Sequence, residues 1–160
     1  MVEEGNMVPE NVDIADLSAQ LAEDGVGLTE ANPVLHSEMT SAISYAESIG
    51  VRDTGIVVLS DALRQPADHR DIAQALLDGS DLSLVIVQSP GGGAAVAHQF
   101  SRAELEAAEA SLFSGVDLNA GLRLFFDDLA TQAAPSTSFL VFLLVLFLVG
   151  VLAITVKVKP

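Results

Sequence analysis

The stretch LSLVIVQSPGGGAAVAHQF, residues 82–100, decides the fold class of this chain. Its first part, Leu82–Gln88, is rich in apolar and β-branched residues, which is typical of a strand buried on both faces. Ser89–Gly93 then predicts a turn. Ala94–Phe100 alternates in a way that predicts a second strand, antiparallel to the first. A β-hairpin is therefore expected here.

Another strand and several helices are expected around this hairpin. Gly55–Ser60 is a short apolar run and predicts a second buried strand. Ser101, followed three residues later by Glu104, predicts a capping box at the start of a helix. The fold class that follows is α/β, with a small, mostly parallel sheet that has a hairpin edge strand and is flanked by helices. Apolar residues at helical spacing predict the helices Asn11–Glu23, His36–Ile49, Asp68–Asp78, Arg102–Phe113 and Leu118–Gln132.

A separate apolar stretch, FLVFLLVLFLVGVLAITV at residues 139–156, contains no charged side chain. As a helix it would span about 27 Å, close to the hydrocarbon thickness of a bilayer. It predicts one C-terminal transmembrane helix in a tail-anchored, single-span protein, and a buried core helix is the competing interpretation. The expected membrane anchor consists of Phe139, Leu140, Phe142, Leu146, Phe147, Leu152, Val156, Lys157 and Lys159.

The predicted organisation has five segments. They are an N-terminal helical or flexible segment (1–34), an α/β domain (35–132), a tether (133–138), the transmembrane helix (139–156) and a basic tail (157–160). The N-terminal sequence has no basic region followed by an apolar one, so no signal peptide is expected. Two lysines after the span favour a domain outside the cell, whereas a four-residue tail crosses a membrane more easily than a domain does. We favour a cytoplasmic domain, with an extracytoplasmic domain as the alternative.

Composition excludes several classes of function. The chain has 160 residues, with 22 acidic against 7 basic residues and a formal net charge of −15. Nucleic-acid binding is excluded because it depends on neutralising phosphates with Lys and Arg. The absence of Cys excludes disulfides, thiol catalysis and Cys-type zinc sites. The expected partners are membrane lipid and a protein with a basic surface.

Glycines and histidines give no recognised ligand motif. Gly91–Gly93 follows a strand but lacks the Gly-Lys-Ser/Thr ending of a phosphate-binding loop. His36, His69 and His98 have no zinc-ligand spacing. Asp68, His69 and Asp71 gather at one helix end, where acidic residues are explained by the helix dipole. No cofactor or metal site is expected, and loosely bound Ca²⁺ is the alternative.

Serines and paired carboxylates give no catalytic motif either. Ser60, Ser89 and Ser101 lie near predicted strand ends, but no Gly-x-Ser-x-Gly elbow is present. Asp127 and Asp128 are adjacent on a predicted helix and project about 100° apart, so they do not share one site. No catalytic residue is expected.

The order of these elements resembles the TPM domain. The matching stretches are DTGIVVLS (53–60), DIAQALLDG (71–79), LSLVIVQSPGGGAAVAHQFSRAELEAAEASL (82–112) and DLNAGLRLFFDDL (117–129). The chain is more closely similar to a small family of actinobacterial single-span membrane proteins of unknown function. The TPM resemblance implies acid phosphatase activity, photosystem repair or Ca²⁺ binding, each known for some members. The chain departs from the TPM pattern at Gly93-Ala94, where a basic residue is usual, so no site residue is transferred.

Two functions are therefore considered. The first is a non-enzymatic interaction or regulatory module, held at the membrane and acting in cell-envelope biogenesis. The second is a TPM-type, metal-assisted phosphatase or hydrolase, which rests on the resemblance alone.

Overall fold

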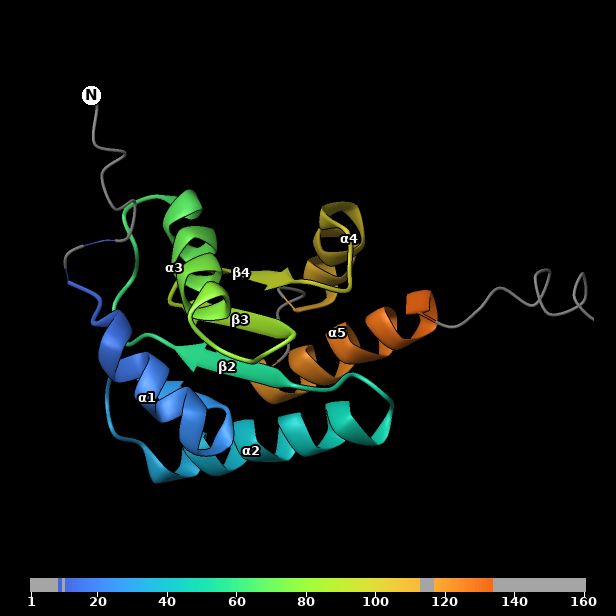
Figure 1. Cartoon of the computed structure of the whole chain (residues 1–160), viewed down its shortest axis with the longest axis horizontal. Helices are drawn as coiled ribbons and strands as arrows, with labels where there is room; N and C mark the ends of the chain where they lie inside the picture. The colour runs from blue at the N-terminus through green and yellow to red at the C-terminus, as the bar shows by residue number, and fades with distance from the viewer. Residues whose placement is uncertain (1–8, 10, 113–116, 134–160) are drawn as a thin grey trace, which may run out of the picture. The chain divides into compact units, whose positions relative to one another are not determined.

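The computed structural model describes residues 9, 11–112 and 117–133 (Figure 1). The chain divides into two units, Met1–Ala130 and Thr131–Pro160, and the fold below concerns the first. In chain order the elements are α1 (Ile14–Asp24), β1 (Val26–Leu28), α2 (Pro33–Ser48), β2 (Thr54–Val58), α3 (Pro66–Asp78), β3 (Leu84–Ser89), β4 (Gly92–Ala97), α4 (Arg102–Leu112) and α5 (Leu118–Ala133).

Side-chain caps determine where the helices begin. Asp13 accepts a hydrogen bond from the Asp16 N–H at the start of α1, at 3.0 Å. Asn32 does the same for the Leu35 N–H at the start of α2. These side-chain oxygens accept from backbone N–H groups that have no partner inside the helix.

The predicted capping box of α4 is confirmed. The Glu104 N–H donates to the Ser101 hydroxyl, and the Ser101 N–H donates to the Glu104 carboxylate at 2.6 Å. Hydrogen bonding of the Glu104 carboxylate to the Ser101 side chain and to the Ser101 backbone N–H lowers the pKa of Glu104.

The four strands form one sheet in the order β1-β2-β3-β4. β1 runs parallel to β2, and β2 runs parallel to β3. β4 is antiparallel to β3 and forms the predicted hairpin with it. The turn between them is Pro90-Gly91, where Gly91 has a φ of 91°, a conformation that suits glycine. The glycines after β3 therefore belong to a hairpin.

β1 was not predicted from the sequence. It has only three residues, Val26–Leu28, and all three are buried. With one glycine inside and another directly before it, the segment shows neither alternation nor a long apolar run, so the sequence pattern indicated a helix end. Pairing of Val26–Leu28 with Ile56–Val58 makes it a strand.

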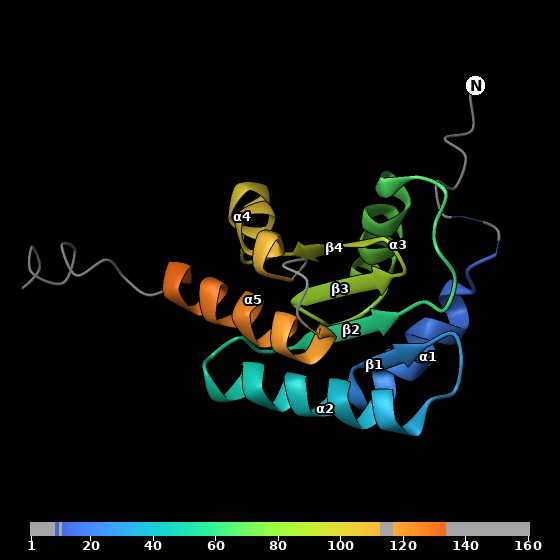
Figure 2. The same ribbon diagram turned by 180° about the vertical axis from the view of Figure 1, so that it is seen from behind.

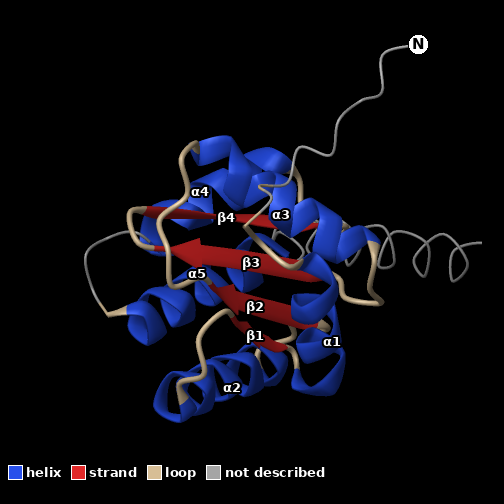
Figure 3. Cartoon of the chain, turned by 90° about the vertical axis from the view of Figure 1, so that its left-hand side faces the viewer, coloured by secondary structure: helices blue, strands red, loops and turns tan. Residues whose placement is uncertain are grey.

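Two apolar clusters lie on opposite faces of the sheet. One lies under α1 and α3 and includes Leu17, Val57 and Val85. The other lies under α2, α4 and α5 and includes Ile56, Ile86 and Phe125. Figure 2 shows the second face, and Figure 3 shows the sheet between its two helical layers. β2 and β3 are therefore buried on both faces, as apolar runs without alternation predict.

The two parallel connections have opposite hands. The chain passes from β1 to β2 through α2 on one face and from β2 to β3 through α3 on the other. Both steps move in the same direction across the sheet. Helices on opposite faces then require one crossover of each hand, although nearly all such crossovers are right-handed.

The predicted fold class needs a correction, because it included a transmembrane helix. Among the described residues, no helix is long and apolar enough to cross a membrane. The longest, α2 and α5, have 16 residues each, whereas a span needs about 20 apolar ones. The predicted span 139–156 and every anchor residue from Phe139 to Lys159 lie outside the described residues. The described fold is a mixed α/β domain with a four-stranded sheet and five helices.

One buried polar atom gives a test of the core. Thr54, at the start of β2, is 3% exposed, and its hydroxyl has no hydrogen-bond partner in the described part of the chain. We expect Thr54→Val to raise the free energy of unfolding by about 1 kcal/mol, because valine keeps the shape and removes an unsatisfied group. Urea unfolding measures the change.

Thr29→Val is the matched control. The Thr29 hydroxyl accepts a hydrogen bond from the Ser60 N–H at 2.8 Å, so this substitution should not stabilise the domain. Equal effects of the two valines would contradict the interpretation of Thr54.

Candidate functional site

The three histidines lie apart, and each has a different environment. His36 on α2 forms an ion pair with Asp24, with 3.0 Å between Nε2 and Oδ2. His69 on α3 is buried, whereas His98 follows β4 and is exposed. In the described ranges, no group of three or more His, Asp or Glu residues is placed to hold a metal ion. Asp68, predicted to lie in a solvated first turn, accepts a hydrogen bond from the Gln65 N–H at the start of α3, at 3.2 Å.

His69 and Ser89 form a buried polar pair that the sequence did not reveal. His69 Nε2 lies 2.7 Å from the Ser89 hydroxyl, and Nδ1 lies 3.3 Å from the Pro66 carbonyl oxygen. Because that carbonyl can only accept, Nδ1 carries a hydrogen, and in a neutral imidazole Nε2 accepts from Ser89. The ring stands against Gly92, where a Cβ would meet Cε1 at 3.4 Å. The pair ties the first turn of α3 to the β3–β4 hairpin.

This pair has the hydrogen bonding of a nucleophile and its base, but it is closed to solvent. A serine bonded to a histidine that is itself oriented by a second acceptor is the arrangement of an activated nucleophile. His69 is 5% and Ser89 is 2% exposed, so a substrate has no access to the hydroxyl in this structure. The direct consequence of the geometry is structural.

Ser60 lies at a small hollow near the ends of β1 and β2. It donates its N–H to Thr29, and the two hydroxyls lie 3.2 Å apart. The hollow has a volume of about 40 Å³. Small-molecule sites usually have about 300 Å³ or more, so the hollow fits a few waters. Its other lining residues are Asn11, Val12, Leu59, Asp61 and Leu63.

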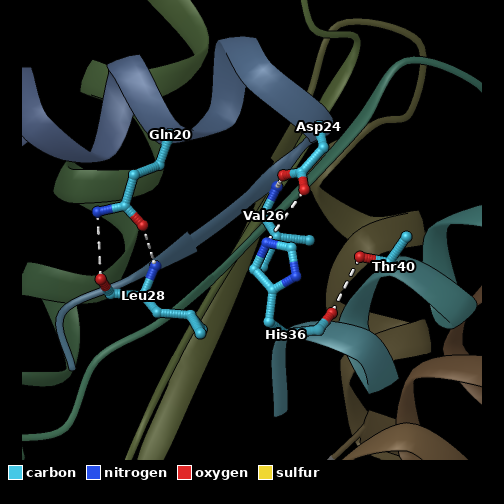
Figure 4. Close-up of polar contacts among 6 residues, drawn as sticks. All are labelled: Gln20, Asp24, Val26, Leu28, His36 and Thr40. Carbon is cyan, nitrogen blue, oxygen red and sulfur yellow. Dashed lines mark hydrogen bonds and ion pairs between the residues drawn. The ribbon is translucent and has the colours of Figure 1, made fainter. Parts of the chain in front are cut away.

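Side chains close the outer edge of β1 (Figure 4). The Gln20 amide on α1 accepts from the Leu28 N–H at 2.9 Å and donates to the Leu28 carbonyl at 3.2 Å. Asp24 accepts from the Val26 N–H with one oxygen and pairs with His36 through the other. One amide and one carboxylate thus take the place of a neighbouring strand at this edge.

The outer edge of β4 is closed at one point. The Ala95 N–H donates to the Glu109 carboxylate on α4, at 2.7 Å. Partial burial raises the pKa of Glu109, while the bond from Ala95 and the positive charge of Arg70 oppose this rise. Glu109 is therefore an anion held where burial disfavours its charge.

Polar contacts also join α5 to the helices beside it. The Tyr45 hydroxyl donates to Asp127 at 2.5 Å, and the Arg123 guanidinium carbon lies 4.7 Å from the centre of the Tyr45 ring. The hydrogen bond to Asp127 raises the pKa of Tyr45. Asp128 instead accepts from the Ser111 hydroxyl on α4. As predicted, Asp127 and Asp128 do not share one site, because their carboxylates bond to different helices, α2 and α4.

Exposed acidic residues are concentrated in the segment that contains α1, β1 and α2, whose two helices lie on opposite faces of the sheet. Residues 11–51 contain seven carboxylates and neither Lys nor Arg. All seven are exposed, and together we call them the acidic face; its members are Asp13, Asp16, Glu23, Asp24, Glu30, Glu38 and Glu47.

Comparison with known proteins supplies the family. The profile of the family described as "Membrane protein Rv1476" matches residues 7–159. The chain belongs to this family. It is therefore a member of a membrane protein family, which agrees with the predicted membrane location and with the resemblance to membrane proteins of unknown function; the TPM resemblance is not shown. No match is found among curated proteins.

One solved structure supports the fold. It is the solution NMR structure of the N-terminal domain of the cg2496 protein from Corynebacterium glutamicum. The likeness has a TM-score of 0.50 and 16% sequence identity, over 81% of this chain and 89% of that chain. At this identity the likeness concerns the fold alone.

The buried pair can be tested by removing one partner. We expect Ser89→Ala to lower the free energy of unfolding by about 1–3 kcal/mol, because it leaves His69 Nε2 buried without a partner. Thermal or urea unfolding of the variant measures this loss. Ser37→Ala, at an exposed position of α2, is the control and should change stability by less than about 0.5 kcal/mol. A loss at Ser89 no larger than at Ser37 would contradict the structural role.

Proposed function

We propose that this member of the Rv1476 family presents its α/β domain at a membrane as a non-enzymatic interaction module. The observation that carries the proposal is the acidic face, whose seven exposed carboxylates lie in a segment, residues 11–51, that contains neither Lys nor Arg. Arg123 of α5 is a cation that lies against this segment, beside Ser41 and Tyr45. The acidic face favours a protein partner with a basic surface, through steering and charge complementarity. We further propose a role in cell-envelope biogenesis, with membrane lipid as the second partner of the chain.

Two features favour binding over catalysis. The Ser–His pair, which has the bonding pattern of a nucleophile and base, is packed beneath the hairpin. The hollow at the strand ends is small compared with a substrate site. A surface, by contrast, needs no cleft to bind a protein.

A TPM-type hydrolase or phosphatase is the alternative. The specific observation in its favour is the 2.7 Å contact between His69 and Ser89, the hydrogen bond that would activate the serine toward a substrate able to reach its hydroxyl. The full chain should then cleave a generic phosphoester, with or without Ca²⁺ or Mg²⁺, and Ser89→Ala should abolish the turnover. Turnover that is absent or unaffected by Ser89→Ala would remove this serine mechanism.

The interaction module is tested by matched charge reversals. We expect Glu30→Lys with Glu38→Lys, both on the acidic face, to reduce cross-linking to the partner in intact cells by at least about 10-fold. Asp61→Lys with Asp81→Lys changes the net charge equally at exposed positions elsewhere and should retain cross-linking. Quantitative mass spectrometry of cross-linked complexes measures both. Equal losses in the two double variants would show an effect of net charge alone.

The side of the membrane is a separate part of the proposal. We propose that the domain faces the cytoplasm. The chain has no Cys, so Ser37→Cys at an exposed position of α2 introduces a single thiol. A membrane-impermeant maleimide should label this thiol only after cell lysis. Labelling of intact cells would place the domain outside and direct the search toward an extracytoplasmic partner.

A further inference from the structure

The two edges of the sheet differ in how their backbone groups are satisfied. At β1, the Val26 N–H and both backbone groups of Leu28 are bonded to side chains of α1 and its end. At β4, the bond from Ala95 to Glu109 identifies which residues point outward. Strand periodicity then directs the N–H groups of Gly93 and Ala97 outward as well. Neither of these two groups has a hydrogen-bond partner in the part of the chain that the structure describes.

β4 also has side chains that allow another backbone to approach. Its sequence is GGAAVA, and it is twice as long as the three-residue β1. Gly93 and Ala97 are partly exposed. Glycine within a strand often marks a place where another backbone comes close. An unpaired edge of this kind is a template for strand addition.

Glu109 occupies the position that the carbonyl of an added strand would take. Its carboxylate accepts the Ala95 N–H, and it is partly buried at a cost to its charge. Movement of Glu109 toward solvent would free the Ala95 N–H and return the carboxylate to water. On the same helix, Glu106 is exposed and already pairs with Arg102. Arg70 and Arg102 already act on Glu109, and a cationic side chain brought by the partner would pair with the released carboxylate in addition to them.

We propose that the outer edge of β4 binds an extended, basic segment of a partner protein, which adds as a fifth strand and replaces Glu109 at the Ala95 N–H. The segment's backbone carbonyls accept from Gly93, Ala95 and Ala97, and its Lys or Arg side chains pair with Glu109. This inference rests on the proposed function in one respect, the basic character of the partner. A second copy of the chain is disfavoured, because strand pairing across a twofold axis would bring one Glu109 toward the other.

Amide hydrogen exchange of the full, ¹⁵N-labelled chain in detergent micelles tests this proposal. The probe is the capped peptide Lys-Val-Lys-Val-Lys-Val, and the matched control is the same peptide with an N-methyl group on every residue. Before addition, Gly93 and Ala97 should exchange much faster than Leu28, whose N–H is bonded to Gln20. The unmodified peptide should slow exchange at Gly93 and Ala97 by at least about 10-fold. The methylated peptide has no backbone N–H to donate along either edge, so it should slow them much less.

The variant Glu109→Gln separates charge from hydrogen bonding. The glutamine amide can still accept from Ala95 but offers no charge to the peptide, so the peptide's Kd should rise several-fold, by up to about 10-fold. An acidic peptide, Glu-Val-Glu-Val-Glu-Val, should not protect Gly93 or Ala97.

Two results would overturn the proposal. One is unchanged exchange at Gly93 and Ala97 under saturating basic peptide. The other is protection confined to α1 and α2, which would place the peptide on the acidic face. Neither result bears on the charge-reversal test of the proposed function, because that test reads cross-linking through Glu30 and Glu38. If the charge reversals left cross-linking unchanged but the peptide still protected Gly93 and Ala97, the β4 edge would bind a strand and the proposed acidic-face interaction would be wrong.

Discussion

Burial of β2 and β3 on both faces is the constraint on which the rest of the domain depends. Both strands pair along their full length and carry apolar side chains toward both helical layers. A parallel pair cannot be joined by a tight turn, so α3 must cross over and cover one face. The opposite face then requires α2, α4 and α5. The opposite hands of the two crossovers follow from this division of helices between the faces.

A sheet of four strands has two edges, and this domain treats them differently. The short edge of β1 is satisfied by Gln20 and Asp24, two polar side chains of the helix that precedes it. The longer edge of β4 is held by one carboxylate, Glu109, whose charge is disfavoured by its burial. The first arrangement is stable in itself, whereas the second leaves backbone donors for another chain. The two edges therefore differ in their outward backbone donors, which are bonded to side chains at β1 and available to another strand at β4.

Charged side chains are distributed unevenly over the domain. The acidic face lies on the part of the domain with α1 and α2, while Arg70 and Arg102 act on Glu109 near the other edge. The chain belongs to a membrane protein family. Under the proposed function, a partner with a basic surface would meet the acidic face and would supply the basic segment that adds to β4.

Features that depend on neighbours along the chain could be predicted from the amino-acid sequence. The hairpin at Pro90-Gly91, the capping box of Ser101 and Glu104, and the buried runs of β2 and β3 all follow from local conformational preference and patterning. The family is also recognised from the sequence, since the family profile matches residues 7–159.

The contacts between residues far apart in the chain follow from three-dimensional packing. β1 is a strand because β2 lies beside it, since three residues with a glycine at the centre carry no periodic signal. His69 and Ser89 are 20 positions apart, and Ala95 and Glu109 are 14 apart, so no spacing rule joins them. Their pairing depends on how helices dock on the sheet, which is set by the complete apolar packing of both faces.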